Sequence, residues 1–467
     1  MSQISILSGI YTDSAGDVRT SLPRNLMPVP KSSGVSTGYL RPADGIKSFG
    51  VGPGIDRGGI NRDGSCYRVM GSKLVQVGAD GAVTTLGDVG TGGQGTLDYS
   101  FDRLAIASGG SLYYWNGAAL TQVTDPDLGT VIDMMWIDGY FMTTDGVNLV
   151  VTELADPTAV NPLKYGSAEV DPDPVKALLK LRDEAYALGR YTIEVFQNIG
   201  GSLFPFQRIP GAMVQRGVIG THACAVYQEA IAFLGSGRDE APSVYLSSNG
   251  SSVPIATREI DQILQGYTEA QLAQAVMEVR VDKAHQLLYI HLPDQCLVYD
   301  AAASKALGVA AWFTLASSLT ALGAYRARNL VWCYDKWVTG DPTSANLGTL
   351  ANDVSSHYGD VIGWEFGTAM LYNEGMGAII HELELVCLPG RVALSADPVV
   401  WASYSTDGQT FSQEKPTSAG KQGQRDKRIA WRRQGHWRNY RIQKFRGNSD
   451  AHLSVMRLDA QIEPLGA

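Results

Sequence analysis

The feature that most constrains the fold of this chain is a repeat of strand–turn–strand segments along its middle part. Each segment has a short apolar run, a turn and a second apolar run, and successive copies start 36 to 56 residues apart. The copies are YRVMGSKLVQV from Tyr67, LAIASGGSLYYW from Leu104, YFMTTDGVNLVV from Tyr140, AYALGRYTIEVF from Ala185, IAFLGSGRDEAPSVYL from Ile231, LLYIHLPDQCLVYD from Leu287 and LVWCYDKWVTG from Leu330. Such units are typical of propeller blades, small sheets that bury their faces only against neighbouring sheets. The repeat predicts a β-propeller of six or seven blades over residues 61–365.

The composition agrees with a mainly β fold. The 467 residues include Gly 52 and Pro 20, together about 15% of the chain, and no G-X-Y period accompanies the glycines. An excess of glycine without that period indicates many tight turns between short strands. The 44% of apolar residues and 18% of charged residues exclude a largely disordered chain.

A short helical insert is expected within the propeller at residues 257–279. The stretch IDQILQGYTEAQLAQAVMEV places apolar side chains at helical spacing, from Ile260 to Val276. Thr268 with Gln271 three positions later predicts a capping box at the start of a second helix. The insert either covers the edge of a blade or packs against a neighbouring subunit.

Outside the propeller, two further regions are expected. Longer alternating segments over residues 366–467 predict a C-terminal β-sandwich, with a hairpin turn at Asp407-Gly408. The first residues, 1–60, are rich in Pro, Gly and Ser and predict an extended N-terminal arm.

The strongest local signal is a basic strand in the C-terminal region. The formal net charge of the whole chain is −9, yet residues 421–446 carry ten Lys/Arg and one acid, Asp426. Trp431, Trp437 and other aromatics alternate with the charges, so the two kinds of side chain are expected largely on opposite faces. The face is a solvated surface, a docking surface for an acidic partner or a DNA-facing patch. The residues assigned to partner docking are Lys427, Arg428, Arg432, Arg433, Arg438 and Arg441.

No motif in the sequence requires an enzyme. Residues 34–38 spell GxSxG, but prolines flank them where a nucleophile elbow needs a strand and a helix. Residues 90–95 spell GxGxxG before a strand-like segment, where a phosphate site needs a helix. Residues 405–411 resemble a single Asp-box turn of sialidases, one residue short. His381-Glu382 lacks the second histidine of HExxH. We expect no catalytic residues, no cofactor and no metal.

The sequence also indicates a chain without membrane insertion. The N-terminus lacks the basic and apolar regions of a signal peptide. Residues 306–325 are uncharged but rich in Ala, Gly, Ser and Thr, and Trp312–Leu315 is expected to be a buried strand. The five cysteines are scattered and form no CxxC, which favours buried free thiols of a protein made in a reducing cytosol.

Several ordered stretches resemble one family of proteins. They run from QRGVIGT (215–221) through APSVYL (241–246), VPIA and ILQGYTEAQLAQAVME to HQLLYIHLP and LVYDA (297–301). GYLRPADGI (38–46), YRVMGSKL (67–74), SSHYG (355–359) and DKRIAWRRQG extend the similarity over nearly the whole chain, least over residues 75–210. The chain resembles the packaged-DNA stabilisation proteins, or tail hub (nozzle) proteins, of short-tailed Salmonella-type phages (podoviruses).

The resemblance implies a structural virion protein made in the host cytoplasm. Its members form a homo-hexamer below the portal and the head-to-tail adaptor ring. They continue the DNA channel, seal the packaged DNA and dock a tail needle (plug) and tailspikes or fibres. Double-stranded DNA would pass the lumen without sequence specificity, and a ring of six chains would carry a formal charge of about −54. The alternative is a receptor-binding or glycan-degrading tail component built on a propeller.

Overall fold

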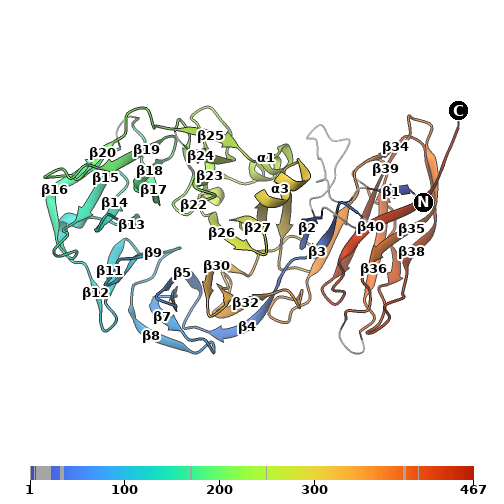
Figure 1. Ribbon diagram of the computed structural model, residues 1–467, viewed down its shortest axis with the longest axis horizontal. Coiled ribbons are helices and arrows are strands. Elements are labelled where there is room, and N and C mark those ends of the chain that lie inside the picture. Colours follow the sequence, from blue (N-terminus) through green and yellow to red (C-terminus); the bar gives the residue numbers. More distant parts are fainter. Residues whose placement is uncertain are drawn as a thin grey trace.

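Seven small antiparallel sheets stand around a common axis, and a sandwich of two larger sheets lies beside them (Figure 1). This computed structural model describes residues 2–4, 6, 23–31, 36–168, 171–248, 250–392, 396–408 and 410–466. Gly34 and Val35 of the GxSxG match, Gln409 of the Asp-box-like turn and residues 7–22 of the expected arm lie outside the described residues. The mainly β fold predicted from the repeat, a propeller followed by a sandwich, is confirmed, with seven blades.

The blades follow one another along the chain. Blade one comprises β5 (Asp56–Arg62), β6 (Ser65–Met70), β7 (Lys73–Val77) and β8 (Val83–Asp88), and blade two β9 (Thr96–Tyr99), β10 (Leu104–Ser108), β11 (Ser111–Trp115) and β12 (Leu120–Gln122). After the 3₁₀ turn η1 (Pro126–Leu128), blade three comprises β13 (Asp133–Ile137), β14 (Tyr140–Thr144), β15 (Asn148–Thr152) and β16 (Val160–Ser167). Blade four comprises β17 (Val175–Leu181), β18 (Glu184–Gly189), β19 (Ile193–Asn198) and β20 (Phe206–Arg208).

Two of the remaining blades differ from the first four. Blade five has a fifth strand, and blade seven takes one strand from the start of the chain. Blade five comprises β21 (Gly217–Val218), β22 (Cys224–Tyr227), β23 (Ala230–Ser236), β24 (Ser243–Ser248) and β25 (Ser251–Pro254), and blade six β26 (Val276–Asp282), β27 (His285–His291), β28 (Cys296–Asp300) and β29 (Trp312–Leu315). Blade seven comprises β30 (Arg328–Cys333), β31 (Lys336–Gly340), β32 (Asn346–Ala351) and, from the start of the chain, β4 (Gly45–Val51). The outer strand β4 therefore closes the ring by pairing with the last propeller strand.

The inner strands of the blades form a closed circle. β5, β9, β13, β17, β22, β26 and β30 each contact the next, and β30 contacts β5. The hydrophobic clusters lie between adjacent blades; Tyr114 of blade two, for example, packs against Phe141 of blade three with ring centroids 5.0 Å apart. Each blade thus buries its faces mainly against its neighbours, as the repeat requires.

In five blades, the inner strand is joined to the strand paired with it by a two-residue turn with positive φ at both positions. Asp63-Gly64 and Asp138-Gly139 have φ angles of 51° and 77°, and of 51° and 91°. This left-handed pair matches the twist of the flanking strands, and Asp-Gly adopts it readily. Gln228-Glu229, Lys283-Ala284 and Tyr334-Asp335 adopt the same backbone without glycine.

Buried carboxylates join neighbouring inner strands. Asp98 accepts a hydrogen bond from the Trp136 N–H (2.6 Å) of the next blade. Asp133 accepts one from the Thr96 hydroxyl (2.6 Å) of blade two and one from the Leu178 N–H (2.8 Å) of blade four. Burial raises the pKa of Asp133 to about 6. Side chains near the axis therefore hold blades two to four in register.

The helical insert is shorter than expected. It contains α1 (Arg258–Gln265) and α2 (Glu269–Leu272), and the capping box of Thr268 and Gln271 is confirmed. The prediction that the insert extends to Val279 is wrong, since Val276 begins β26, where the inner strand of blade six takes over. Ile260 and Leu264 pack into the core of blades four to six, and a third helix, α3 (Ala301–Leu307), was not expected. The buried strand predicted at Trp312–Leu315 is β29.

The sandwich lies next to blades six and seven (Figure 1). Its first sheet contains β1 (Ser2–Ile4), β2 (Leu26–Pro30), β3 (Gly38–Pro42), β40 (Val455–Pro464), β35 (Ala378–Cys387) and β38 (Ile429–Trp437). Its second sheet contains β33 (Gly363–Gly367), β34 (Leu371–Tyr372), β39 (Tyr440–Asn448), β36 (Val399–Ser405) and β37 (Lys415–Ser418). β36 and β37 pair antiparallel, but their connection spans residues 406–414, so the predicted hairpin turn at Asp407-Gly408 is instead part of a longer loop.

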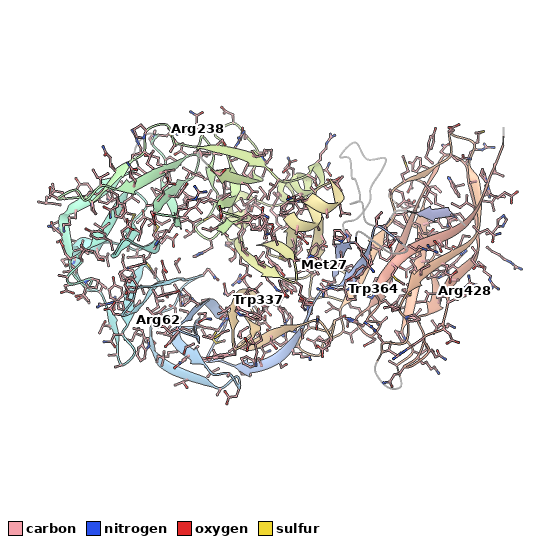
Figure 2. The ribbon with its side chains drawn as sticks, viewed as in Figure 1. Met27, Arg62, Arg238, Trp337, Trp364 and Arg428 are labelled. Atoms are coloured by element: carbon pink, nitrogen blue, oxygen red, sulfur yellow. The ribbon has the colours of Figure 1, made fainter. Side chains whose placement is uncertain are left out.

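The described part of the N-terminal region differs from the predicted extended arm. β2 and β3 belong to the sandwich, β4 completes blade seven and β5 begins blade one. In β2, Leu26 points into the core of the sandwich and Met27 into the core of blades six and seven. Figure 2 shows Met27 and Trp364 at the junction of the two parts. One strand therefore contributes alternate side chains to both cores.

We expect Asp133→Ala to lower the free energy of unfolding by about 1–3 kcal/mol, because the Thr96 hydroxyl and the Leu178 amide lose their acceptor. Denaturant unfolding measures the loss, with Asp127→Ala, an exposed aspartate, as control. Because the pKa of Asp133 is raised in the folded state, its contribution to stability falls as pH rises from 3.8 to about 6. The difference in the free energy of unfolding between wild type and Asp133→Ala should therefore narrow over that pH range. Equal free energies of unfolding for Asp133→Ala and Asp127→Ala would contradict the role of Asp133 as a bridge between blades.

Candidate functional site: the basic face of the sandwich

The basic strand predicted from sequence is β38 together with the turn into β39. β38 is the edge strand of its sheet. Trp431 and Trp437 are buried, and Trp431 packs against Phe445 of the second sheet with ring centroids 5.3 Å apart. Arg432 and Arg438 are exposed on the other side. The expected separation of aromatic and charged side chains is therefore present along β38.

A β-bulge brings two consecutive arginines to the surface. The pairing of β35 with β38 shifts between Ile380 and Glu382, and Arg433 has a positive φ of 55° at this point. Strict alternation would have turned either Arg432 or Arg433 inward. Both side chains are instead exposed.

Two of the basic side chains are neutralised by the neighbouring strand. The Arg428 guanidinium donates to Glu382 (2.6 Å) and to Glu384 (2.8 Å), both on β35. Arg432 donates to the second oxygen of Glu382 (3.2 Å). The hydrogen bond from Arg428 lowers the pKa of Glu384 and keeps it charged. Arg428 lies on the sandwich away from the propeller (Figure 2).

Three of the predicted docking residues have no ion pair with any residue that the structure describes. Lys427, Arg433 and Arg438 are exposed. Lys427 precedes β38, Arg433 lies at the bulge and Arg438 lies in the turn between β38 and β39. Their charges remain available to a partner.

Arg441 is not available, contrary to the prediction. Its side chain is completely buried inside the sandwich and donates to the Gln434 carbonyl (2.6 Å) and the Gln443 side-chain oxygen (2.9 Å). Its guanidinium carbon lies 3.9 Å from the centre of the Tyr404 ring. Burial lowers the pKa of Arg441 to about 10. Arg441 is a core residue of the sandwich.

The sequence reasoning missed the acidic partners on β35. Glu382 and Glu384 alternate with apolar residues in HELEL, a pattern that places both on one face. The alternation alone does not show that these glutamates face the arginines. That depends on the register of β35 against β38, two strands that are far apart in the sequence.

Potential metal ligands do not gather in one place among the described residues. Within them, no group of three His, Cys, Asp or Glu side chains is placed to hold a metal ion. The five cysteines are free, and burial raises the pKa of Cys387 to about 12. Residues 90–95, which spell GxGxxG, connect β8 to β9 rather than a strand to a helix. No helix in the described part of the chain has the length and apolar character needed to cross a bilayer.

The architecture defines a class of two-part proteins, a seven-bladed propeller joined to a β-sandwich. Models of bacteriophage P22 Gp10 match both parts, the β-propeller over residues 2–355 and the β-sandwich over residues 363–463. The chain belongs to the P22 Gp10 family. It is 30% identical to the tail hub protein gp10 of Salmonella phage P22 over 459 residues, which cover 93% of this chain and 94% of that protein. It is accordingly a structural component of a phage tail.

Two solved structures that are similar to the chain share little sequence identity with it. The Neurospora crassa Pan2 WD40 domain has a TM-score of 0.42 and 10% identity, covering 66% of this chain and 96% of that domain. The computationally designed protein Ika8 has a TM-score of 0.39 and 12% identity, and the match covers 72% of this chain and 99% of that protein.

We expect Arg441→Ala to lower the free energy of unfolding by about 2–4 kcal/mol, because it leaves a cavity and two buried acceptors without a donor. Arg438→Ser changes an exposed side chain, so its free energy of unfolding should stay within about 0.5 kcal/mol of the wild-type value. Thermal and denaturant unfolding of the two variants measure this contrast. Equal stabilities would contradict the core role of Arg441.

Proposed function

We propose that this chain assembles as a homo-hexameric ring below the portal and the head-to-tail adaptor ring. The ring continues the DNA channel, seals the packaged DNA in the head and docks the tail needle and the tailspikes or fibres. The observation that carries the proposal is the similarity to the P22 tail hub protein over both parts of the chain. The work is mechanical and needs no catalytic residue.

The architecture suits a load-bearing ring subunit. β4 closes the propeller, and β2 contributes side chains to two cores, so the two parts of the subunit are coupled. A coupled subunit transmits force between the rings above it and the components below it. The net charge of −9 per chain favours passage of DNA without tight phosphate contacts.

The basic face of the sandwich is the proposed docking surface for an acidic partner. Lys427, Arg433 and Arg438 supply charges that form no ion pair with the described residues. Arg428 and Arg432 share the carboxylates of β35. Complementary charge steers and orients such a contact more than it adds affinity.

The hub function predicts a specific defect in particles made without this gene. Their heads should package DNA and then lose it, and they should carry no tail assembly, because the seal and the attachment ring are missing. Electron microscopy with DNA quantification measures both features. Stable, DNA-filled and tailed but non-infectious particles would contradict the hub and favour a receptor-binding or glycan-degrading component.

The docking surface predicts an assembly defect without a folding defect. Replacing Arg432, Arg433 and Arg438 with Ser should weaken attachment to the partner and leave the unfolding transition of the chain unchanged. Sedimentation of purified protein with tail-less heads measures attachment. Replacement of Arg182, Lys283 and Lys305, exposed on the propeller, removes the same charge and serves as control. Normal particles from the sandwich variant would exclude this face as the docking surface.

A further inference from the structure

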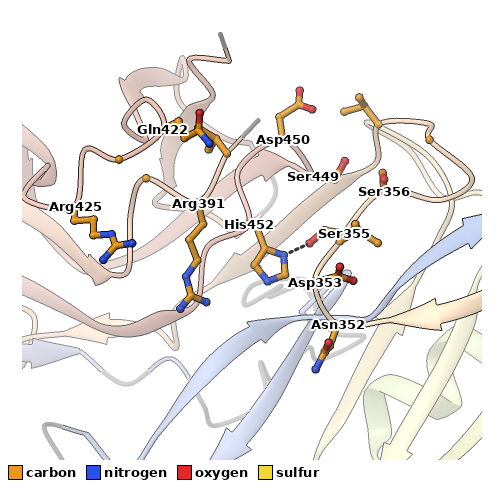
Figure 3. A pocket seen from close by; sticks show the side chains of 16 residues that line it. Asn352, Asp353, Ser355, Ser356, Arg391, Gln422, Arg425, Ser449, Asp450 and His452 are labelled. Atoms are coloured by element: carbon orange, nitrogen blue, oxygen red, sulfur yellow. Dashed lines mark hydrogen bonds between the residues drawn. The ribbon is translucent and has the colours of Figure 1, made fainter. Parts of the chain in front are cut away.

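A polar cleft of about 940 Å³ lies between the end of the propeller and the sandwich (Figure 3). One wall is formed by propeller residues 352–361, and the other by sandwich loops at residues 390–392, 422–425 and 449–452. Clefts of this size at the junction of two domains are preferred places for ligands and short peptide segments. No predicted docking residue lines it, although Arg425 belongs to the basic segment recognised in the sequence.

Two arginines give the cleft its charge. Arg391 and Arg425 line the sandwich side, and Figure 3 shows them next to each other. Neither forms an ion pair with the described residues. Other arginines of the sandwich do, since Arg428 binds the carboxylates of β35 and Arg446 binds Glu414. The cleft therefore retains cationic groups, as the basic face does at Lys427, Arg433 and Arg438, whereas Arg428 and Arg446 are neutralised.

The backbone holds the two arginine loops together. The Gly423 N–H donates to the Gly390 carbonyl at 3.2 Å. Gly390 has a φ of 78°, and a Cβ there would lie 3.0 Å from the backbone nitrogen of Gln424. Only glycine permits this close approach without strain. The backbone contact thus keeps the loops that carry Arg391 and Arg425 close together.

A histidine connects the two walls of the cleft. His452 Nδ1 lies 2.6 Å from the Ser355 hydroxyl, across the cleft (Figure 3). Burial and the nearby charge of Arg391 lower the pKa of His452 and favour a neutral ring. The neutral ring and the hydroxyls of Ser355 and Ser449 offer hydrogen bonds beside the two guanidinium groups.

The acidic residues of the cleft select among anions. Asp450 lines it, and so does Asp353, which pairs with Lys47 at 2.7 Å. A continuous phosphate backbone would be repelled by these carboxylates and by the net negative charge of the chain. A single carboxylate can still be bound by two guanidinium groups, which hold carboxylates through charge-assisted hydrogen bonds.

We propose that this cleft binds glutamate or aspartate side chains of an acidic segment of another tail protein. The inference rests on the proposed function, since it assigns a partner chemistry to one place on the hub. The occupant is an acidic peptide because, among the described residues, Arg391 and Arg425 form no ion pair, whereas Asp450 is the one lining carboxylate without one.

The test uses the full-length protein and a blocked tetraglutamate peptide as the probe. Titration calorimetry or NMR should detect binding to wild type, and the double variant R391Q/R425Q should bind about tenfold more weakly, because two charged hydrogen-bond donors are lost. The double variant R182Q/K305Q, which removes the same charge from exposed side chains of the propeller, outside the cleft and the basic face, is the matched control and should bind like wild type. Unfolding curves of both variants confirm that the fold is intact.

Each other outcome overturns the inference. Absence of peptide binding to wild type, or equal binding by the double variant, excludes the cleft as a carboxylate site. Binding of a short DNA duplex that the double variant loses, without peptide binding, assigns the arginines to nucleic acid instead. The hub function is tested separately, by the particles made without the gene. If those particles lose their DNA and carry no tail, but the purified protein does not bind tetraglutamate, only the cleft proposal is refuted.

Discussion

The two parts of this chain are held together by one short segment near the N-terminus, and the remaining architecture depends on it. The Asn25 amide donates to the Ala316 carbonyl (2.9 Å) at the end of blade six and to the Gly363 carbonyl (2.7 Å) at the start of the sandwich. Leu26 and Met27 then enter the two cores, where burying each side chain is worth about 1.5–3 kcal/mol. Further along, β4 completes blade seven. Separation of the sandwich from the propeller would thus break polar and apolar contacts together.

Closure of the propeller combines this end-to-end pairing with side-chain bridges near the axis. A ring of small sheets opens most easily where neighbouring blades meet, because no strand pairing crosses those interfaces. Asp98 and Asp133 reach across such interfaces to backbone amides. Burying carboxylates costs free energy, which the raised pKa of both groups reflects. The bridges therefore fix the relative position of the blades at some expense of stability.

The sequence predicted the blades well because their second and third strands are apolar and recur. The inner strands were less visible, since they carry buried acids and some of their turns, such as Lys283-Ala284, lack glycine. The N-terminal strands were hidden by Pro28 and Pro30, which suggested an arm; both lie in β2, at the sheet edge, where proline is tolerated. At the candidate site, alternation identified the exposed arginines. It failed for Arg441, because the bulge at Arg433 and the turn at Arg438 reset the alternation before β39 begins.

The cations on the sandwich divide into those that are neutralised and those that are not. Arg428, just before β38, and Arg432 within it already bind Glu382, and a partner would have to displace those contacts. Exposed pairs of this kind contribute only about 0–1 kcal/mol each, so displacement is possible but brings little net gain. Cations that form no ion pair with the described part of the chain lie before the strand, at the bulge and in the following turn, and two more line the junction cleft. An acidic partner that meets these groups together would contact both the sandwich and the end of the propeller. Docking would then add contacts across the same junction that β2 holds from within.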